Sequence, residues 1–286
     1  MIITRNQSEI VAAIKSAKLE KSDVVFGFIA TMGALHDGHM SIIELAKNQC
    51  DIVICSIFVN PAQFNNPKDL ETYPRTLSAD KKLLENNGCD ILLLPTVEAV
   101  YPEGILPYDI NLEGLDAGME GTFRPGHFTG VCMVVQRFLE MVAPDKAYFG
   151  KKDFQQLAII QKMAAIRNLP VEIVGAPIKR AENGLALSSR NALLTDQQRE
   201  SASLIYRALK EGMTNYQLHP ESETIRAKIE ASFKNSEFTI EYIAIVHNNS
   251  LKEVAIADEN CSVCIVVFCE NVRLLDNMQF ADFVAI

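Results

Sequence analysis

Two histidines three residues apart, His36 and His39, stand where an apolar stretch ends and an amphipathic stretch begins. Residues 24–30 (VVFGFIA) predict a buried strand, and the residues from Met40 onward (MSIIELAK) predict a helix. Gly33 permits a tight exit from the sheet, and Gly38 leaves room for a ligand at the first helical turn. Because a helix N-terminus offers free N–H groups and a positive dipole end, the junction is predicted to hold phosphate.

The spacing of the two histidines places both imidazoles on one side of the helix. There they could donate hydrogen bonds to phosphoryl oxygens that gain charge in a displacement reaction. The run from Gly33 to His39 also resembles a Walker A loop, but His39 and Met40 stand where that loop needs Lys and Ser or Thr. Single histidines in helices are usually surface or core residues; here two of only five histidines flank one glycine, which favours a functional pair.

Two other polar segments could bind phosphate. Residues 188–191 (SSRN) supply two hydroxyls and a guanidinium, although the same residues could simply cap the helix that follows. Residues 150–153 (GKKD) follow a predicted strand, and Asp153 could cap the next helix. Lys152 could reach a phosphoryl oxygen, whereas Lys151 is more typical of a solvated surface charge.

Two glutamines and one loop are candidates for binding a second substrate. Gln63 lies just after a predicted strand, in FVNPAQF, and Gln156 opens a predicted helix. Their amides can bind a carboxylate or a hydroxyl without adding charge. Arg124 and His127 lie in EGTFRPGHFTGV, a loop shaped by Gly and Pro before an apolar helix, and are predicted to form a lid or wall of the site.

Composition excludes several classes of protein. A net charge of -9 over 286 residues disfavours nucleic acid as a main partner, and no apolar run is long enough to span a membrane. The N-terminal residues read as a strand and a charged helix rather than a signal peptide, so we expect a cytoplasmic protein.

Seven cysteines, an odd number, fit reduced thiols. Cys261 and Cys264 form a CxxC in a β-rich run, where zinc binding is disfavoured because no second pair accompanies it.

Strands and helices alternate through the first part of the chain, which predicts an α/β fold with a doubly wound parallel sheet. In such sheets ligands bind beyond the carboxyl ends of the strands, where all three polar segments at residues 31–39, 59–64 and 150–156 are expected. After Gly175 the pattern changes to a polar loop, two helices (about 195–212 and 221–233) and three strands. We therefore predict two domains, residues 1–176 and a smaller α+β lid of residues 177–286.

Six motifs stand in the order and spacing of one family: TMGALHDGHMSII, SIFVNPAQF, DLETYPRTLSAD, MEGTFRPGHFTGV, YFGKKDFQQL and GLALSSRNALLT. Over nearly its whole length the chain closely resembles the pantothenate synthetase (pantoate–beta-alanine ligase) family, nucleotidyltransferases with an HxGH motif. The resemblance implies a Rossmann-like fold and an ATP-dependent condensation of pantoate with beta-alanine to pantothenate. It also implies a pantoyl-adenylate intermediate, release of AMP and pyrophosphate, Mg2+, and a cytoplasmic homodimer.

The resemblance also implies roles for individual residues. His39 is the implied proton donor, and His36, Lys152 and Arg190 are the other implied catalytic residues. Gln63, Gln156, Arg124 and His127 are implied to bind pantoate and beta-alanine. The implied ATP-binding residues are Met32, Gly33, Ala34, Leu35, His36, Asp37, Gly38, His39, Gly150, Lys151, Lys152, Asp153, Lys179, Leu187, Ser188, Ser189 and Arg190, with Lys179 acting through its backbone. The magnesium ligands are left unassigned.

Two positions depart from the family pattern, and two alternative functions stay open. Ala30 stands where the family usually has Pro, and Lys151 where it usually has Glu. The enzymatic alternative is another adenylate- or cytidylate-forming transferase; length and acidity disfavour a tRNA synthetase. The non-enzymatic alternative is a nucleotide-binding sensor without turnover, which the joint presence of His36, His39, Lys152 and Arg190 disfavours.

Overall fold

The computed structural model describes residues 1–64 and 67–283 and divides into two compact units. Unit 1 comprises Met1–Asp116, Glu120–Lys151 and Gln156–Pro177, and unit 2 comprises Ala117–Met119, Lys152–Gln155 and Ile178–Ile286.

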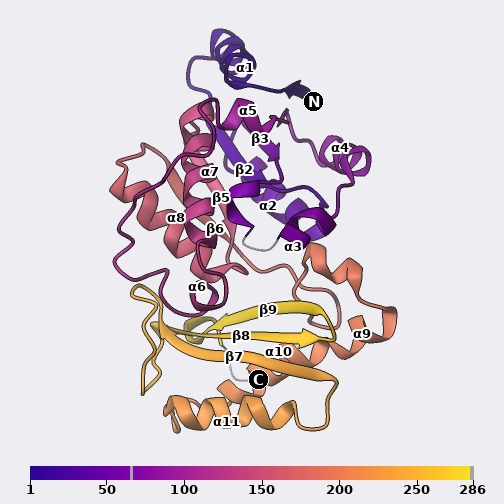
Figure 1. Ribbon diagram of the computed structural model, residues 1–286, viewed down its shortest axis with the longest axis vertical. Coiled ribbons are helices and arrows are strands. Elements are labelled where there is room, and N and C mark those ends of the chain that lie inside the picture. Colours follow the sequence, from indigo (N-terminus) through magenta and orange to yellow (C-terminus); the bar gives the residue numbers. More distant parts are fainter. Residues whose placement is uncertain (65–66, 284–286) are drawn as a thin grey trace. The chain divides into compact units, whose positions relative to one another are not determined.

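Unit 1 is built on a parallel sheet of six strands in the order β1-β4-β3-β2-β5-β6, with helices on both of its faces (Figure 1). The prediction of a doubly wound parallel sheet is therefore confirmed. The strands are β1 (Ile2–Thr4), β2 (Phe26–Thr31), β3 (Ile52–Ile57), β4 (Ile91–Leu93), β5 (Lys146–Gly150) and β6 (Glu172–Ala176). The helices are α1 (Gln7–Glu20), α2 (Asp37–Lys47), α3 (Pro67–Thr72), α4 (Leu77–Asn86), α5 (Val97–Val100), α6 (Glu120–Phe123), α7 (His127–Val142) and α8 (Phe154–Ile166), with a 3-10 turn, η1 (Pro61–Gln63).

Successive residues of the central strand β2 pack on opposite faces of this sheet. Phe28 meets Phe138 of α7 edge to face, with ring centroids 5.9 Å apart. Ile29 belongs to the apolar cluster that contains Met40 and Ile43 of α2. All five of these side chains are buried, which explains why the strand reads as a continuous apolar run rather than an alternating one.

The strand β2 begins two residues later than its apolar run. The N–H of Val25 donates to Asp51 Oδ2 at 2.9 Å, and the N–H of Phe26 donates to Asp145 Oδ2 at 2.7 Å. Val25 lies just before the strand and Phe26 is its first paired residue, so these carboxylates bind the N–H groups at the start of regular pairing. At the other end the strand runs one residue past Ala30, because Ala30 pairs with Ser56 of β3 and Thr31 with Ile57.

The order of the strands puts a topological switch point between β2 and β5. The chain passes from β2 to β3 on one side, whereas β5 pairs with β2 on the other side, in the register Gly27 to Lys146 and Ile29 to Tyr148. Ligands of doubly wound sheets bind at the carboxyl ends of the strands beside such a point. Those ends lead here into residues 32–39 after β2 and residue 151 after β5.

Unit 2 contains a three-stranded antiparallel sheet in the order β7-β8-β9, with helices α10 and α11 packed against it (Figure 1). The strands are β7 (Phe238–His247), β8 (Cys261–Cys269) and β9 (Val272–Gln279). The helices are α9 (Asp196–Ser201), α10 (Ser203–Met213) and α11 (Ser222–Ser232), with 3-10 turns η2 (Ser189–Leu193) and η3 (Phe280–Asp282). The smaller α+β fold predicted for this part of the chain is confirmed.

One predicted helix in unit 2 is wrong in detail. Residues 195–212 were expected to form a single helix, but α9 ends at Ser201 and α10 begins at Ser203. Serine side chains compete for backbone hydrogen bonds and so favour helix ends over helix interiors. The second helix packs closely on α11, since a Cβ added to Gly212 would come within 2.3 Å of Ile229 Cγ1.

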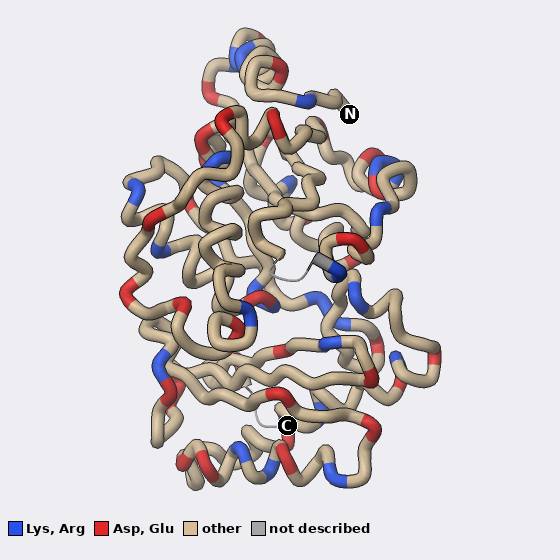
Figure 2. Tube along the Cα trace, in the orientation of Figure 1, with Lys and Arg blue, Asp and Glu red and all other residues tan. Residues whose placement is uncertain are grey.

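In the part of the chain that the structure describes, no helix is both long enough and apolar enough to cross a membrane. Basic and acidic residues are interspersed along the helices of both units (Figure 2).

Candidate active site

His36 and His39 form a reciprocal cap at the start of α2. His36 is the N-cap residue, and its Nδ1 accepts a hydrogen bond from the N–H of Gly38 at 3.1 Å. His39 Nδ1 accepts from the N–H of His36 at 3.3 Å. The two ring centroids lie 4.1 Å apart, so the imidazoles stand together as their spacing predicts.

This cap changes which atoms of the motif can meet a ligand. The expectation that the first N–H groups of the helix are open to an anion is wrong for Gly38, whose N–H is bound to His36, and for His39, whose N–H donates to His36 O at 2.8 Å. Because Nδ1 of each ring acts as an acceptor, a neutral ring carries its proton on Nε2. The groups suited to donate to phosphate are therefore the side-chain Nε2–H groups.

A buried carboxylate holds the turn before the histidines. Gly33 and Ala34 both adopt left-handed backbone, with φ of 82° and 50°. Asp80 of α4, 2% exposed, accepts from the N–H of Ala34 at 3.1 Å and from the N–H of Leu35 at 2.9 Å. Thr76 donates its hydroxyl to the same carboxylate at 3.0 Å. Asp80 carries no assigned role from the sequence; the available signal was an acidic residue at a buried position of an amphipathic helix.

The segment after β5 lies at the neighbouring strand end. The N–H of Lys151 donates to Ala176 O at 2.8 Å, continuing the pairing of β5 with β6 by one residue. Its side chain is not a freely solvated one: a Cβ added to Gly175 would be 3.3 Å from Lys151 Cγ, so the stem lies along β6. Gly150 and Lys151 thus flank the switch point opposite the histidine motif.

Gln63 is buried within a network of neutral hydrogen bonds. Its Nε2 donates to the Sδ of Met32 at 3.0 Å, and its Oε1 accepts from Asn60 Nδ2 at 3.1 Å. Asn60, 1% exposed, in turn accepts from the hydroxyl of Tyr101 at 2.9 Å. Burial raises the pKa of Tyr101 far above its usual range, so this hydroxyl stays a donor. Asn60 and Tyr101 were not identified from the sequence, because 41 residues separate them.

His127 holds Gln63 from the other side. Its Nε2 lies 3.0 Å from Nη1 of Arg124, and since guanidinium can only donate, Nε2 is the acceptor. The proton of the neutral ring is then on Nδ1, which donates to the backbone oxygen of Gln63 at 2.9 Å. His127, predicted to form part of a lid or wall of the site, is 5% exposed, and both of its ring nitrogens are bonded within unit 1.

The helix that carries His127 lies directly on the turn that carries Gln63. A Cβ added to Gly130 of α7 would come within 2.2 Å of Ala62 O, and Gly130 O accepts from Asn60 Nδ2 at 3.1 Å. Only glycine fits this approach of two backbones.

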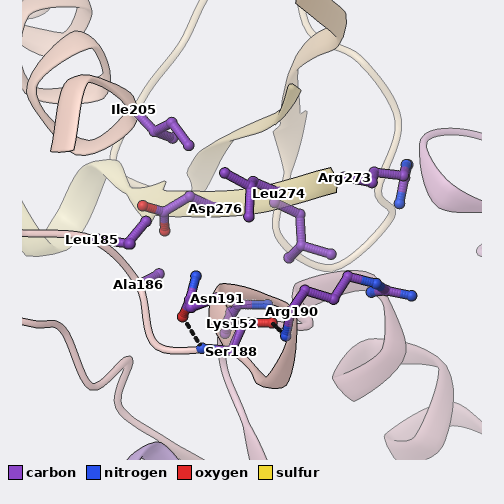
Figure 3. Close-up of a pocket in the computed structure, with 11 residues that line it drawn as sticks. Lys152, Leu185, Ala186, Ser188, Arg190, Asn191, Ile205, Arg273, Leu274 and Asp276 are labelled. Atoms are coloured by element: carbon purple, nitrogen blue, oxygen red, sulfur yellow. Dashed lines mark hydrogen bonds between the residues drawn. The ribbon is translucent and has the colours of Figure 1, made fainter. Parts of the chain in front are cut away.

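Unit 2 brings the SSRN segment and Lys152 to one pocket. Its lining is shown in Figure 3 and consists of Lys152, Leu185, Ala186, Ser188, Arg190, Asn191, Ile205, Arg273, Leu274, Leu275 and Asp276. Ser188 Oγ accepts from the N–H of Arg190 at 3.3 Å, and Asn191 Oδ1 accepts from the N–H of Ser188 at 2.5 Å. The segment therefore caps its own turn, η2, while α9 is capped by Thr195.

The other predicted residues of unit 2 lie in two segments: Lys152 and Asp153 in one, and Lys179 and Leu187 in the loop before this turn. Lys152 is mostly buried, and its Nζ is 3.8 Å from Asp153 Oδ1. The backbone oxygen of Lys179 accepts from the N–H of Leu187 at 3.0 Å.

The predicted site residues are thus divided between the two units. Unit 1 holds Met32, Gly33, Ala34, Leu35, His36, Asp37, Gly38, His39, Gly150, Lys151, Gln63, Gln156, Arg124 and His127. Unit 2 holds Lys152, Asp153, Lys179, Leu187, Ser188, Ser189 and Arg190. Within residues 1–64 and 67–283, no group of three or more His, Cys, Asp or Glu side chains could hold a metal ion.

A doubly wound parallel sheet with a capped histidine pair and a basic segment at adjacent strand ends defines an α/β protein of the kind that binds phosphorylated ligands at a switch point. The family model of pantoate-beta-alanine ligase matches residues 2–279, and the chain belongs to this family. It is therefore an enzyme of the ligase class, as the resemblance of its motifs implied.

Individual relatives agree with this assignment. Pantothenate synthetase from Bacteroides fragilis is 46% identical over 258 residues, which cover 90% of this chain and 91% of that protein. The crystal structure of pantothenate synthetase from Thermus thermophilus is similar with a TM-score of 0.89 at 36% identity, covering 98% of this chain and 99% of the other. Pantoate-beta-alanine ligase from Francisella tularensis, complexed with beta-gamma ATP and beta-alanine, gives a TM-score of 0.81 at 34% identity and covers 99% of both chains.

Proposed function

We propose that this chain condenses pantoate with beta-alanine to form pantothenate, driven by ATP, in two steps. In the first, a carboxylate oxygen of pantoate attacks the α-phosphorus of ATP, the bond to the β-phosphate breaks, and pyrophosphate leaves. In the second, the amine of beta-alanine attacks the acyl carbon of pantoyl adenylate, loses a proton, and displaces AMP. Family membership supports this reaction, as does the relative whose crystal contains an ATP compound and beta-alanine.

The observation that carries the proposal is the reciprocal cap of His36 and His39 beside the switch point. With both Nδ1 atoms accepting backbone hydrogen bonds, both Nε2–H groups are donors suited to phosphoryl oxygens. Pre-oriented donors stabilise charge that develops in a transition state, because no reorganisation is needed when the charge appears. His39 is the proposed proton donor, with His36, Lys152 and Arg190 stabilising the same charge.

The other residues divide into nucleotide and acid binding. For ATP we propose Met32, Gly33, Ala34, Leu35, Asp37, Gly38, Gly150, Lys151, Asp153, Lys179, Leu187, Ser188 and Ser189 in addition to the four catalytic residues. For pantoate we propose direct contacts from Gln63 and Gln156, with His127 and Arg124 acting mainly by fixing Gln63. Residues 177–286 are proposed to act as a lid domain over the ATP- and pantoate-binding domain of residues 1–176.

Magnesium is proposed to arrive with the nucleotide. Mg2+ is commonly held by substrate phosphates, waters and one or two carboxylates rather than by a protein cage, and the described residues offer no such cage. The ion would neutralise phosphate charge on the bound nucleotide. The homodimeric assembly and cytoplasmic location that the resemblance implies belong to the same proposal.

The reaction is tested by supplying ATP, Mg2+, pantoate and beta-alanine and measuring pantothenate and AMP by mass spectrometry. A reaction without beta-alanine serves as the control, and labelled pyrophosphate should exchange into ATP in that control when pantoate is present. Formation of ADP would reject the proposed reaction, and exchange that requires beta-alanine would reject the two-step order.

A further inference from the structure

Two adjacent polar residues in the last strand of unit 2, Asp276 and Asn277, are almost fully buried, each 3% exposed. Buried polar side chains in a strand need partners, and these two bind different segments of the chain. Asp276 binds the guanidinium of Arg180, while Asn277 Nδ2 donates to the backbone oxygen of Lys152 at 2.7 Å.

The guanidinium of Arg180 contacts four residues, Asp276, Tyr206, Gly184 and Asn277. Its Nη1 and Nη2 donate to the two carboxylate oxygens of Asp276 at 2.5 and 2.9 Å, a bidentate geometry that fixes orientation as well as distance. Its Cζ atom lies 4.0 Å from the ring centroid of Tyr206. The remaining donor capacity reaches the backbone oxygens of Gly184 and Asn277 at 3.2 and 3.3 Å.

These contacts fix the loop that leads into the SSRN segment. The N–H of Ala181 donates to Leu185 O at 2.9 Å, and the N–H of Leu187 donates to Lys179 O at 3.0 Å, so the loop closes on itself. Arg180 joins this closed loop to β9 through Asp276. Ser188, which directly follows the last residue of this loop, Leu187, starts the turn that carries Arg190.

Lys152 is joined to the same strand one residue further on, through Asn277. Lys152, Ser188 and Arg190 line one pocket together with Asp276 (Figure 3). The figure shows Arg273, Leu274 and Asp276 along the strand, with Lys152, Ser188, Asn191 and Arg190 facing them. Asp276 and Asn277 of β9 therefore anchor two basic segments of unit 2, namely Lys152 and, through Arg180, residues 188–191.

We propose that Asp276 and Asn277 are positioning residues for nucleotide binding, Asn277 acting through Lys152 and Asp276 acting through Arg180 on the turn of Ser188 and Arg190. The inference rests on the proposed role of Lys152 and Arg190 in contacting ATP. Lysine and arginine side chains are long, so a small shift of the backbone moves their charged ends. A small displacement of a group that meets the transition state lowers the reaction rate strongly. Fixing the backbone from which each side chain starts reduces that displacement.

Asn277→Ala is the variant that tests the inference, because Asp276→Asn removes half of a buried ion pair and could unfold unit 2. We expect the dissociation constant for ATP, measured by titration calorimetry without pantoate, to rise about tenfold, because Lys152 is then no longer held in the position from which it meets the phosphates. The pantoate dependence of pyrophosphate exchange should stay as in the parent. Ser262→Ala is the matched control: it removes the hydrogen bond that the buried Ser262 in the same sheet donates to Asn248, without touching Lys152 or residues 188–191.

A double variant separates positioning from general stability. If Asn277 acts through Lys152, Asn277→Ala in a Lys152→Ala background should weaken ATP binding no further than Lys152→Ala alone. Losses that multiply in the double variant, or parent-like ATP affinity in Asn277→Ala, would overturn the inference. A parent protein that binds ATP but makes no pantothenate would instead contradict the proposed function and leave this ATP titration valid as a test.

Discussion

The carboxylate of Asp80 accepts a hydrogen bond from the backbone N–H of Leu35, 45 residues earlier in the chain, at 2.9 Å. This bond joins α4 to the turn that precedes the histidine pair. The turn contains two consecutive residues in left-handed conformation, one of which, Ala34, has a side chain and is therefore strained there. An ionised carboxylate only accepts hydrogen bonds, so it suits a position where backbone N–H groups converge.

Asp80→Ala should reduce both stability and catalysis, because it leaves the N–H groups of Ala34 and Leu35 without their acceptor. We expect the free energy of unfolding to fall by about 2–4 kcal/mol and the adenylation rate to fall about tenfold or more. Asp80→Asn, which keeps one acceptor oxygen, should lie between the parent and Asp80→Ala. Urea unfolding and pyrophosphate exchange measure the two effects, with Ser78→Ala on the exposed side of α4 as the control. An Asp80→Ala protein as active as Ser78→Ala would contradict the assigned role.

The capping role of His36 can be separated from its chemical role. Asparagine is a preferred N-cap residue, so His36→Asn should keep the start of α2 intact while removing the Nε2–H donor. His36→Ala should lose the cap as well, which lowers the free energy of unfolding by about 1 kcal/mol relative to the parent. If both variants lose adenylation equally and differ only in stability, the ring contributes to the reaction; a fully active His36→Asn would limit His36 to capping.

His39→Ala should lower the adenylation rate about a hundredfold, the usual loss for a donor that meets developing charge. Circular dichroism should be unchanged, because the ring lies in the first turn of α2 and its loss leaves the helix interior intact. Near-normal exchange of pyrophosphate into ATP would mean that the residue serves the local structure alone.

The sequence predicts the arrangement of elements better than it predicts the contacts that refine the site. Alternating strands and helices suffice for the parallel sheet, and the change to helices followed by three strands suffices for the smaller second fold, because burial patterns and turn residues are local signals. The contacts of Asp80 with Leu35 and of Arg180 with Asp276 join residues 45 and 96 positions apart, and no local pattern reports such pairings. The same holds for His127: the sequence shows a polar residue in a loop motif, but no local pattern reports that its ring binds the backbone of Gln63, 64 residues away.

Gln63→Ala and Gln156→Ala should raise the pantoate concentration needed for half-maximal exchange while leaving ATP affinity nearly unchanged. Each lost hydrogen bond to pantoate is worth about 1–3 kcal/mol if its partner stays buried and unpaired. Exchange kinetics over a pantoate series and calorimetric titration with ATP alone measure the two quantities. Collapse of ATP affinity with a parent-like pantoate dependence would move these glutamines to the nucleotide site.

Gly130→Ala should also weaken pantoate binding, although it alters no polar side chain. The new methyl would lie 2.2 Å from Ala62 O, so α7 and η1 must move apart and displace Gln63. We expect a destabilisation of about 1–3 kcal/mol, the scale of overpacking, together with a raised KM for pantoate. Gly118→Ala is the control, since nothing lies within 4 Å of the added Cβ there. Equal KM values for pantoate in the two variants would contradict a link between this helix packing and Gln63.

The titration of two buried thiols should change the free energy of unfolding at alkaline pH. Burial raises the pKa of Cys89 and of Cys132 from 9.0 to about 12. Between pH 9 and 12 the unfolded chain has released these protons while the folded chain still holds them, so raising the pH favours unfolding. Their contribution to stability is complete below pH 9 and is lost progressively as the pH rises toward 12.

Each of these thiols should lower the free energy of unfolding by up to about 1.4 kcal/mol per pH unit within that window. The double variant Cys89→Ala and Cys132→Ala should therefore lose stability less steeply with pH than the parent, even though its stability near neutrality is lower because two side chains have been shortened. Urea unfolding under reducing conditions, at several pH values below and above 9, gives both slopes. The tyrosines with raised pKa values are present in both proteins and cancel in the comparison. Parallel curves for the parent and the double variant would show that these two thiols titrate alike in the folded and unfolded chain.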